Sequence, residues 1–491
     1  MGEQPKKDKT LSWLVIVICV FILRTFAWMT SELWYDEVLT LQRFVLPHIE
    51  HPLEIFRDYP IANNHLLFTW LACLWTNLLD GFFSELFLRL PSLLFGIASI
   101  AVVMLHWHRH LGNLWAGICG ILLAISPVYT AYAYQLRGYS LTILLGITAI
   151  SGLLELLEKR TAAGQALLCI SGFLLPLVIP TNLMLMPAMA ATGVLLLKEK
   201  ENNNWKTAIL SMLPWCVACV VGGSYYLTIW EQFRRATAEP DGWTSMVQVA
   251  GNLLLALFAH GAVLIVCMVT HVREGRIISK GLWLSWAALA ATALAVMLAG
   301  KSGHTPFPRV FLVLLPLATF LLMKCAAAMP SMEKVNASIL VAAILVNGIV
   351  WERVAEGLTD YQLKHGYFPD NLLQQYYRGS SDLRDISEAK NLDLANALVI
   401  LEPYDEMSGA FYIRLMGRPD AQGIAIGINT VNDNIREQLA KMPLRKFAVT
   451  RSAEEAKDLF KRAGFEMPGG KMPRKLFGTN SSRRALFEFD D

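Results

Sequence analysis

Two adjacent carboxylates follow the first membrane-length hydrophobic run of the sequence. The run covers residues 11–30, and Asp36 and Glu37 come shortly after it in Trp34-Tyr35-Asp36-Glu37-Val38. Carboxylates are costly near hydrocarbon and usually persist there because of a function or a partner. At a membrane surface such a pair could accept a proton from a hydroxyl group or hold a cation. The alternative is a polar cap that closes a hairpin.

The second candidate is an arginine among aromatic residues. Arg137 lies in Tyr134-Gln135-Leu136-Arg137-Gly138-Tyr139, between two hydrophobic stretches. A guanidinium keeps its charge and can hold a phosphate with paired hydrogen bonds, which suits a phosphate leaving group. The alternative is an arginine that reaches lipid headgroups while the tyrosines form an interfacial belt.

The composition is that of an integral membrane protein. The chain has 491 residues, of which 54% are hydrophobic and only 17% are charged, whereas soluble domains carry about 25% charged residues. Hydrophobic stretches of about 20 residues, long enough to cross a bilayer as helices, recur as far as Trp351. The net charge of +3 is too small and too dispersed to indicate a nucleic-acid partner.

Hydropathy and charge together predict a topology. We expect eleven transmembrane helices, at 11–30, 86–107, 113–130, 138–157, 164–180, 182–197, 206–228, 246–270, 281–299, 308–328 and 336–351. Basic residues between them fall on the side of the N-terminal lysines, which is therefore cytoplasmic. The apolar segment 64–79 has only 16 residues, so we expect it to lie in the outer interface. Asp36, Arg137 and the C-terminal residues are then all expected outside the cytoplasm.

The order of these features resembles the GT-C glycosyltransferases. The resemblance rests on Asp36-Glu37 after the first span, a long first outer loop, Arg89-Leu90-Pro91 opening the next span, and the Arg-x-Tyr motif at Arg137. The nearest branch is bacterial family 39, akin to protein mannosyltransferases and the aminoarabinose transferase of lipid A. The match covers roughly residues 10–330.

This resemblance implies both a fold and an activity. The implied fold is a polytopic α-helical membrane protein of GT-C type, with interfacial helices in the first outer loop. The residues beyond the match are expected to form a small C-terminal α/β domain. Such enzymes pass a sugar from a polyprenyl-phosphate donor to an acceptor outside the cytoplasm. The implied enzyme is an inverting transferase. In it Asp36 would act as the base, Glu37 would orient Asp36 or bind hydroxyl groups, and Arg137 would bind the phosphate.

The sequence departs from the family pattern at two places. Gln135 stands where many relatives carry an acidic residue, and Asn63-Asn64-His65-Leu66 replaces a common His-Pro-Pro pattern. A glutamine cannot act as a base or hold a cation by charge. We therefore expect no required metal or other cofactor, and a divalent cation is kept as the alternative.

Further polar residues are candidates for substrate binding. They are Tyr134, Gln135 and Tyr139 beside Arg137, Asn64 and His65 in the first loop, Arg89, and Lys301, His304 and Arg309 where the chain enters span 308–328. Asn64 could instead cap a helix, and both arginines could be structural. His106, His108 and His110 are not expected to come together as metal ligands, because alternate spacing on a helix separates them.

The chain is expected to divide into a transmembrane catalytic domain, 1–351, and an extracytoplasmic α/β domain, 352–491. The latter should contain strands at 397–401, 423–427 and 446–450, an edge strand at 484–490, and helices at 405–417 and 452–464. The second helix opens with a capping-box sequence at Ser452. We expect this domain to act as a lid or docking surface.

The resulting hypothesis is an enzyme of the bacterial cytoplasmic membrane. Its expected partners are a polyprenyl-phosphate sugar donor, a glycan, lipid or protein acceptor, and the lipid bilayer, with no nucleic acid. The alternatives are an O-antigen ligase or polymerase, a non-catalytic assembly subunit, and a transporter or lipid flippase. Transporters often show internal repeats and mid-membrane charges, and no repeat of the first 150 residues is evident. The sequence names neither the sugar nor the acceptor.

Overall fold

The chain divides into two compact units. The computed structural model describes residues 10–62, 64–79, 84–200, 204–238, 279–299, 308–327, 382–388, 397–402, 405–412, 424–466, 471–478 and 484–489, and the single residues Ala250, Arg353, Gly357 and Leu394. The first unit consists of Met1–Met29 and Phe44–Tyr376, and the second of Thr30–Arg43 and Tyr377–Asp491. The segment that carries Asp36 and Glu37 therefore belongs to the same unit as the C-terminal residues.

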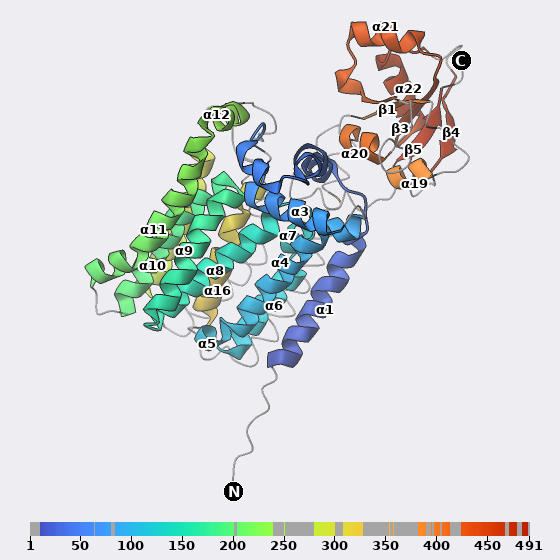
Figure 1. Cartoon of the computed structure of the whole chain (residues 1–491). Coiled ribbons are helices and arrows are strands. Elements are labelled where there is room, and N and C mark those ends of the chain that lie inside the picture. Colours follow the sequence, from blue (N-terminus) through green and yellow to red (C-terminus); the bar gives the residue numbers. More distant parts are fainter. Residues whose placement is uncertain are drawn as a thin grey trace. The chain divides into compact units, whose positions relative to one another are not determined.

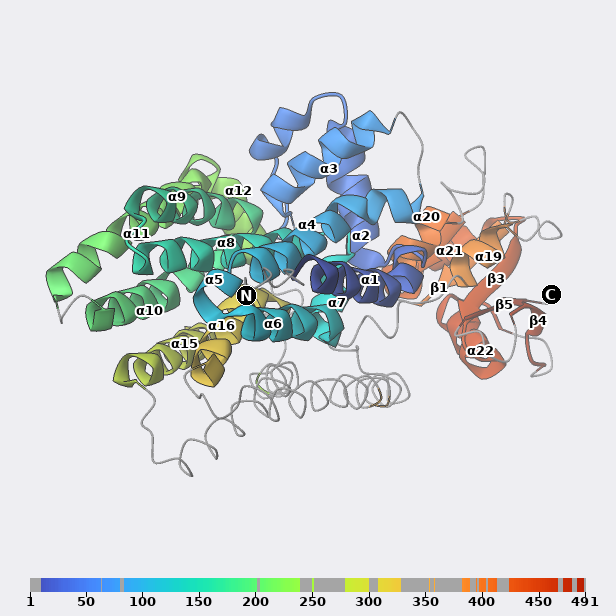
Figure 2. The same cartoon turned by 90° about the horizontal axis from the view of Figure 1, so that it is seen from below.

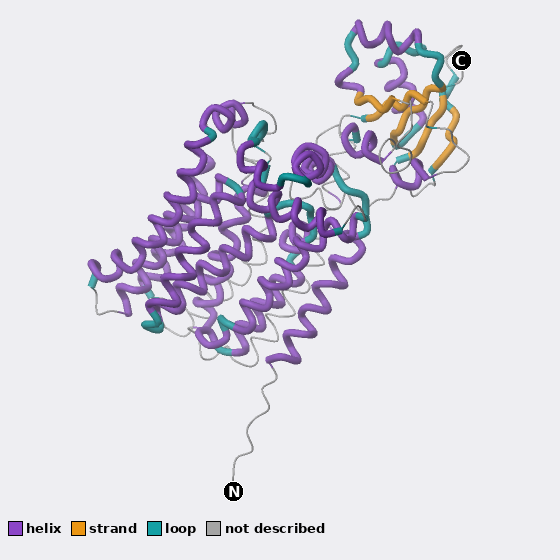
Figure 3. Tube along the Cα trace, in the orientation of Figure 1, coloured by secondary structure: helices purple, strands orange, loops and turns teal. Residues whose placement is uncertain are grey.

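Every regular element in the described part of the first unit is helical (Figures 1 and 3). Its helices are α1 (Thr10–Met29), α3 (Leu66–Leu78), α4 (Glu85–Leu105), α5 (His108–Leu111), α6 (Asn113–Ile125), α7 (Pro127–Ala133), α8 (Tyr139–Leu157), α9 (Thr161–Val178), α10 (Leu185–Lys200), α11 (Trp205–Thr228), α12 (Trp230–Ala238), α15 (Lys280–Ala299) and α16 (Leu315–Ala327). The tight turns η2 (Leu46–His48), η3 (Pro52–Arg57), η4 (Pro180–Met184) and η6 (Pro308–Leu314) lie between them.

The expected membrane helices are present wherever the structure describes them. Seven helices in the described part of the chain are long and apolar enough to cross a membrane, while the helices at Leu11–Phe26 and Asn113–Ile125 are apolar but shorter. The seven longer helices confirm seven of the eleven expected spans, and the two shorter ones lie at the expected spans 11–30 and 113–130. The other two, 246–270 and 336–351, lie outside the described residues. The protein is thus a multispanning membrane protein.

The short apolar segment of the first loop forms helix α3. Its 13 residues extend about 20 Å at 1.5 Å per residue, which is less than the roughly 30 Å hydrocarbon core of a bilayer. Figures 1 and 2 show α3 running across the direction of the neighbouring helices rather than alongside them. Its length and direction are those expected of an interfacial helix.

Helix α8 is the central element of the first unit. All but two of its residues are buried, and it packs against α4, α9 and α16. Gly152 on α8 and Gly164 on α9 face each other so closely that a Cβ on Gly152 would lie 2.9 Å from the Gly164 carbonyl oxygen. Small residues at such contacts let membrane helices approach closely. Tyr139 at the start of α8 is thereby held in a rigid frame.

A break separates α9 from α10. Helix α9 ends at Val178, and the next residue, Ile179, is extended. The turn η4 then begins at Pro180. Inside this break the Asn182 amide donates to the Leu175 carbonyl at 3.0 Å and to the Thr142 hydroxyl at 2.9 Å. The side chain thus satisfies a backbone group at the interruption.

The second unit is a small α/β structure together with the loop after α1. Its helices are α2 (Tyr35–Leu39), α19 (Asp382–Glu388), α20 (Glu406–Phe411), α21 (Asp433–Lys441) and α22 (Ala453–Arg462), with a π-helical turn η1 (Thr40–Val45) after α2 and a tight turn η9 (Ile428–Thr430). Its strands are β1 (Ala397–Leu401), β2 (Ile424–Gly427), β3 (Arg445–Thr450), β4 (Arg474–Phe477) and β5 (Ala485–Glu488). The sheet order is β2-β1-β3-β5-β4.

Strand directions divide this sheet into two parts. β1 is parallel to β2 and β3, with Val399 opposite both Ala425 and Phe447. β5 is antiparallel to β3 and β4. The expected strands at 397–401, 423–427 and 446–450 are thus confirmed as elements. The strand expected at 484–490 is also present, as β5, but its expected position at the edge of the sheet is wrong, because β4 pairs with β5 on the side away from β3 and all four β5 residues are buried.

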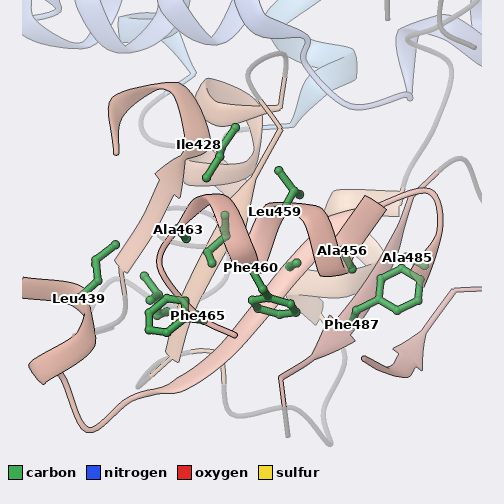
Figure 4. Close-up of a cluster of buried hydrophobic side chains, with 12 residues drawn as sticks. Ile428, Leu439, Ala456, Leu459, Phe460, Ala463, Phe465, Ala485 and Phe487 are labelled. Carbon is green, nitrogen blue, oxygen red and sulfur yellow. The ribbon is translucent and has the colours of Figure 1, made fainter. Parts of the chain in front are cut away.

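One face of the sheet packs against helix α22. Phe460 and Leu459 of this helix contact a cluster that includes Ile400, Ala448 and Phe487 (Figure 4). The helix begins where Ser452 Oγ accepts a hydrogen bond from the Glu455 backbone N–H at 3.2 Å, as the capping-box sequence predicts. The Glu455 carboxylate does not complete the box. It accepts instead from the Thr450 hydroxyl at 2.7 Å and the Arg451 N–H at 3.2 Å.

Candidate active site

Arg137 and His65 form a buried polar cluster in the first unit. Nη2 of Arg137 lies 3.1 Å from Nε2 of His65, and the backbone N–H of Gly138 donates to Nδ1 of the same ring at 2.8 Å. Arg137 is 1% exposed and His65 is 5% exposed. His65 immediately precedes α3, and Arg137 precedes α8, so the contact joins two segments 72 residues apart. Two of the sequence-predicted binding residues therefore meet.

The hydrogen bond from Gly138 decides the protonation of His65. Burial lowers the pKa of His65 well below its ordinary value, and the charges of Arg137 and Arg309 lower it further. The ring is therefore neutral at physiological pH and has one lone pair, on the nitrogen that accepts from Gly138. Its proton is then on Nε2, which faces the Arg137 guanidinium. Two N–H donors thus face each other, an arrangement that an anionic oxygen could stabilise.

Aromatic rings complete this cluster. The Tyr139 ring lies edge-to-face with His65, with centroids 4.9 Å apart, and Cζ of Arg137 is 5.7 Å from the Tyr139 centroid. Tyr132 also packs edge-to-face with Tyr139, with ring centroids 5.0 Å apart. These contacts are within the range of aromatic and cation–π interactions. They fix the orientation of the cationic group and keep it in a partly apolar environment.

The absence of a side chain at Gly138 allows the close approach of His65. A Cβ atom at this position would lie 2.6 Å from Cγ1 of Val178 and 3.1 Å from Nδ1 of His65. The backbone angles of Gly138 are ordinary, with φ −72° and ψ 5°. The glycine is therefore required for space rather than for conformational freedom.

Arg89 and Tyr134 form a separate contact with a structural role. Nη1 of Arg89 donates to the carbonyls of Trp28 at 2.8 Å and Met29 at 3.2 Å, at the end of α1. The guanidinium also lies 5.4 Å from the Tyr134 ring centroid. A positive side chain at the carboxyl end of a helix binds its last carbonyls and opposes its dipole. Arg89 thus ties α4 to the end of α1.

Gln135 and Asn64 are also used by the fold. The Gln135 amide nitrogen donates to the Ala131 carbonyl at 2.7 Å, and its backbone carbonyl accepts from the Ser92 hydroxyl and the Arg137 N–H. The Asn64 amide donates to the Asp58 carbonyl at 3.0 Å and accepts from the Thr69 hydroxyl at 3.0 Å.

Three candidates come from the loop before span 308–328. Arg309, at the start of η6, is buried, and its charge contributes to the lowered pKa of His65. It therefore adds positive charge near the cluster. Lys301 and His304 lie outside the described residues.

The acidic pair lies in the second unit, on helix α2. Asp36 is 6% exposed and Glu37 is fully buried. Oε2 of Glu37 accepts from the Trp34 backbone N–H at 3.2 Å, so this carboxylate closes the first turn of its own helix. The Thr40 hydroxyl donates to the Asp36 carbonyl at 2.8 Å and closes the next turn. Helix α2 packs against α20 of the α/β structure.

An ion network that the sequence analysis missed lies just before α2. Arg484 donates to both carboxylate oxygens of Asp405, from Nε at 2.8 Å and from Nη2 at 2.7 Å, and its Nη1 lies 3.4 Å from Oε2 of Glu32. The Arg384 backbone N–H donates to the other Glu32 oxygen at 2.9 Å. Burial raises the pKa of Glu32 to about 7, against the lowering effect of Arg484. Asp405 thus takes two hydrogen bonds from the Arg484 guanidinium, and Glu32 is a second carboxylate beside the same group.

Comparison with known proteins identifies the architecture. No protein-family model matches the chain, and no curated protein matches it either. The crystal structure of ArnT from Cupriavidus metallidurans in the apo state is similar with a TM-score of 0.51 and 12% identity, covering 98% of this chain and 99% of that one. The structure of that ArnT bound to undecaprenyl phosphate gives 0.50 and 13%, with 98% of each chain covered. The protein has the GT-C fold.

A third structure is also similar to this chain. It is the Archaeoglobus fulgidus oligosaccharyltransferase tethered with an acceptor peptide, with a TM-score of 0.49 and 11% identity, covering 93% of this chain and 70% of that one.

The two residues of the ion network that were not predicted, Arg484 and Glu32, have weak signals in the sequence. Arg484 lies in Ser481-Ser482-Arg483-Arg484-Ala485, where an arginine pair reads as ordinary surface charge. Glu32 lies only four positions before Asp36. What distinguishes it from an ordinary loop glutamate is its burial beside the Asp405 carboxylate. That property follows from a partner more than 450 residues away.

Proposed function

We propose that the protein is an inverting glycosyltransferase that uses a polyprenyl-phosphate sugar donor. The observation that carries this proposal is the buried pair formed by Arg137 and His65, whose N–H groups face each other in a GT-C fold. Arg309 adds a further positive charge near this pair. A phosphate oxygen is the ligand that such a set of donors favours.

In this proposal the cluster of the first unit holds the leaving group. As the bond between the anomeric carbon and the phosphate oxygen breaks, the electron pair stays on the phosphate. Arg137 donates to the developing charge with a planar fork, and the Nε2–H of neutral His65 adds a third donor. Donors placed in advance at a developing charge are usually a large part of the catalytic effect.

The second part of the proposal assigns the base to Asp36. The acceptor hydroxyl attacks the anomeric carbon on the face opposite the phosphate, and its proton passes to the Asp36 carboxylate. One carboxylate suffices for such a single displacement, which inverts the anomeric configuration. Glu37 holds the first turn of α2 in place, because its carboxylate accepts from the Trp34 N–H. Positioned proton transfer contributes roughly 10²–10⁴-fold to a rate.

The location and partners follow from the topology. Positive charge between the spans predicts that the reacting groups and the C-terminal residues lie outside the cytoplasm of a bacterial inner membrane. A polyprenyl-phosphate donor reaches such a site through the bilayer, and the acceptor is a glycan, a lipid or a protein.

A deletion strain tests this function. Loss of a single sugar from a lipid, polysaccharide or protein of the source cell, restored by a plasmid copy, is the expected result. Unchanged glycans together with altered uptake of a solute would contradict the transferase and indicate a carrier. Accumulation of an unligated polyprenyl-linked oligosaccharide would instead indicate a ligase or polymerase.

A further inference from the structure

Two histidines and a glutamate come together near the end of α8 that is opposite Tyr139. His106 and His110 lie four positions apart around α5, with ring centroids 5.3 Å apart. Nε2 of His106 lies 2.7 Å from Oε1 of Glu155, near the end of α8. The expectation that the histidines stay apart is therefore wrong for this pair, because four residues make about one helical turn. Glu155 follows Tyr139 by about 24 Å along the helix, at 1.5 Å per residue, so this cluster is remote from Arg137.

Ligand atoms of all three side chains converge. One ring nitrogen of each histidine and one carboxylate oxygen of Glu155 lie within 4.8 Å of one another. Two imidazoles and one carboxylate are a common donor set for Zn²⁺, which in a tetrahedral site leaves a fourth position for water. Nδ1 of His106 and Nε2 of His110 are buried and have no hydrogen-bond partner among the described residues.

The surrounding charges orient these ligands. Nδ1 of His110 contacts Oε1 of Glu158 at 3.0 Å, which assigns the ring proton to Nδ1 and leaves the lone pair on Nε2. Metal-binding histidines commonly donate their other ring N–H to a carboxylate in this way. Arg160 contacts the outer oxygens of both Glu155, at 3.4 Å, and Glu158, at 3.7 Å. The guanidinium therefore holds both carboxylates while their inner oxygens face the imidazoles.

We propose that His106, His110 and Glu155 bind a divalent transition-metal ion such as Zn²⁺, with Glu158 orienting His110. The ion would join the ends of α4 and α8, and so has a structural role on the membrane face away from the glycosyl-transfer site. The alternative is an ion-pair network that needs no metal.

Zinc binding to the purified full-length protein in detergent tests this site. After removal of metal by a chelator, the wild type should bind one Zn²⁺ per chain, and added ZnCl₂ should raise its melting temperature. His110→Ala should weaken binding at least tenfold, and Glu158→Gln by roughly 10–100-fold, as outer-shell changes do. His108→Ala is the matched control on the same turn and should bind as the wild type does. Absence of bound zinc in the wild type, or equal weakening by His108→Ala, would overturn the proposal.

A separate observation concerns the segment that carries Asp36. Glu32 and Leu33 lie directly before α2, and both are bound by residues of the C-terminal part of the second unit. The Leu33 N–H donates to the Tyr412 hydroxyl at 2.7 Å, and Glu32 contacts Arg484. Nη1 of Arg384 also donates to the Thr30 carbonyl at 3.2 Å.

The residues of this attachment are buried. Tyr412 is fully buried, and Glu32 is 4% exposed. Hydrogen bonds of this kind contribute more when water is excluded, because a lost partner leaves a buried polar group unsatisfied. The attachment therefore fixes the backbone where α2 begins.

We infer that Tyr412 and Arg484 are positioning residues for Asp36. The α/β structure is then a support that sets the position of the base, rather than a lid. This inference rests on the proposed function for its catalytic consequence, but the positioning itself can be measured without a substrate.

Hydrogen exchange of the full-length protein tests the positioning. In Tyr412→Phe, exchange in α2 should be roughly two- to tenfold faster, the equivalent of one hydrogen bond, while α22 is unchanged. Arg445→Ala, at a half-exposed arginine of the same sheet, is the control and should leave α2 as in the wild type. Unchanged exchange in α2 of both Tyr412→Phe and Arg484→Ala would overturn the inference.

A second readout links the positioning to function. The amount of glycan product per folded protein should fall in Tyr412→Phe. If Asp36→Asn abolishes the product but Tyr412→Phe leaves it unchanged, the positioning role is wrong and the transferase stands. If Asp36→Asn itself leaves the product unchanged, the proposed function is wrong.

Discussion

Nη2 of Arg137 lies 3.1 Å from Nε2 of His65, while the opposite nitrogen of the ring accepts the N–H of Gly138. The backbone thereby makes the imidazole a donor toward the guanidinium. Two such donors repel each other, and both gain from an anionic oxygen that accepts from the two N–H groups together. This relationship predicts a site that favours a phosphate group over a neutral ligand.

Replacement of Arg137 should weaken binding of undecaprenyl phosphate. A charged hydrogen bond contributes about 1.5–3 kcal/mol, so Arg137→Ala should raise the Kd roughly 10- to 100-fold. Arg137→Lys should fall in between, because lysine keeps the charge but loses the planar fork. Binding to detergent-purified protein is the measurement. Arg109→Ala, at an exposed arginine of the same unit, is the control. Wild-type affinity in Arg137→Ala would show that the arginine does not contact the phosphate.

Addition of a methyl group at Gly138 should separate His65 from its donor. The new Cβ would lie 2.6 Å from Val178, so the neighbours must move, at a cost of about 1–3 kcal/mol. Thermal unfolding should therefore show a lower melting temperature for Gly138→Ala. Gly117→Ala is the matched control, because no atom lies within 4 Å of its added Cβ. A helical glycine replaced by alanine gains up to about 1 kcal/mol. Equal melting temperatures for the two variants would contradict the close approach.

Ionisation of Glu32 should make stability depend on pH. Its pKa is raised from 4.5 to about 7 in the folded protein, mainly by burial. The folded state then binds a proton that the unfolded state has released, so stability falls as the pH rises from about 4.5 to about 7 and is level above it. Glu32→Gln should remove this contribution, and Glu454→Gln, at an exposed position, should not. Denaturation curves at several pH values are the measurement, and the same slope in Glu32→Gln would refute this assignment.

Arg89 should prove structural rather than substrate-binding. Arg89→Leu leaves the Trp28 and Met29 carbonyls without the guanidinium donor, which should lower stability by about 1–3 kcal/mol. The affinity for undecaprenyl phosphate, measured on the folded fraction, should stay at the wild-type level. A tenfold loss of affinity at unchanged stability would place Arg89 in the binding site instead.

Sequence periodicity predicted the local elements well, because their signals are local. One example is the apolar run at 138–157, which forms helix α8. Another is helix α22, which begins after the Ser452 cap and is followed by Gly464 with a positive φ. The limits appear where a partner is distant. β5 alternates in sequence like an edge strand, but β4, which was not predicted, covers its far side.

The candidate site shows the same limit. Pairing of His65 with Arg137 could be expected only from the family resemblance, since 72 residues separate them. The hydrogen bond from the Gly138 N–H to His65 determines which ring nitrogen carries the proton. It comes from the backbone, so the residue types do not reveal it. Likewise, the sequence left open whether Arg89 binds substrate or is structural, and the structure places its guanidinium on the carbonyls at the end of α1.

The central claim is that Asp36 is the base of a glycosyl transfer, and one measurement addresses it directly. Cells that lack the chromosomal copy are complemented with wild type, Asp36→Asn or Asp433→Asn, an exposed aspartate of the same unit, at equal membrane levels. Mass spectrometry of the cell-envelope glycans is the readout. We predict that Asp36→Asn lacks the same sugar as the deletion strain, while Asp433→Asn restores it. Full restoration of that sugar by Asp36→Asn would contradict the account.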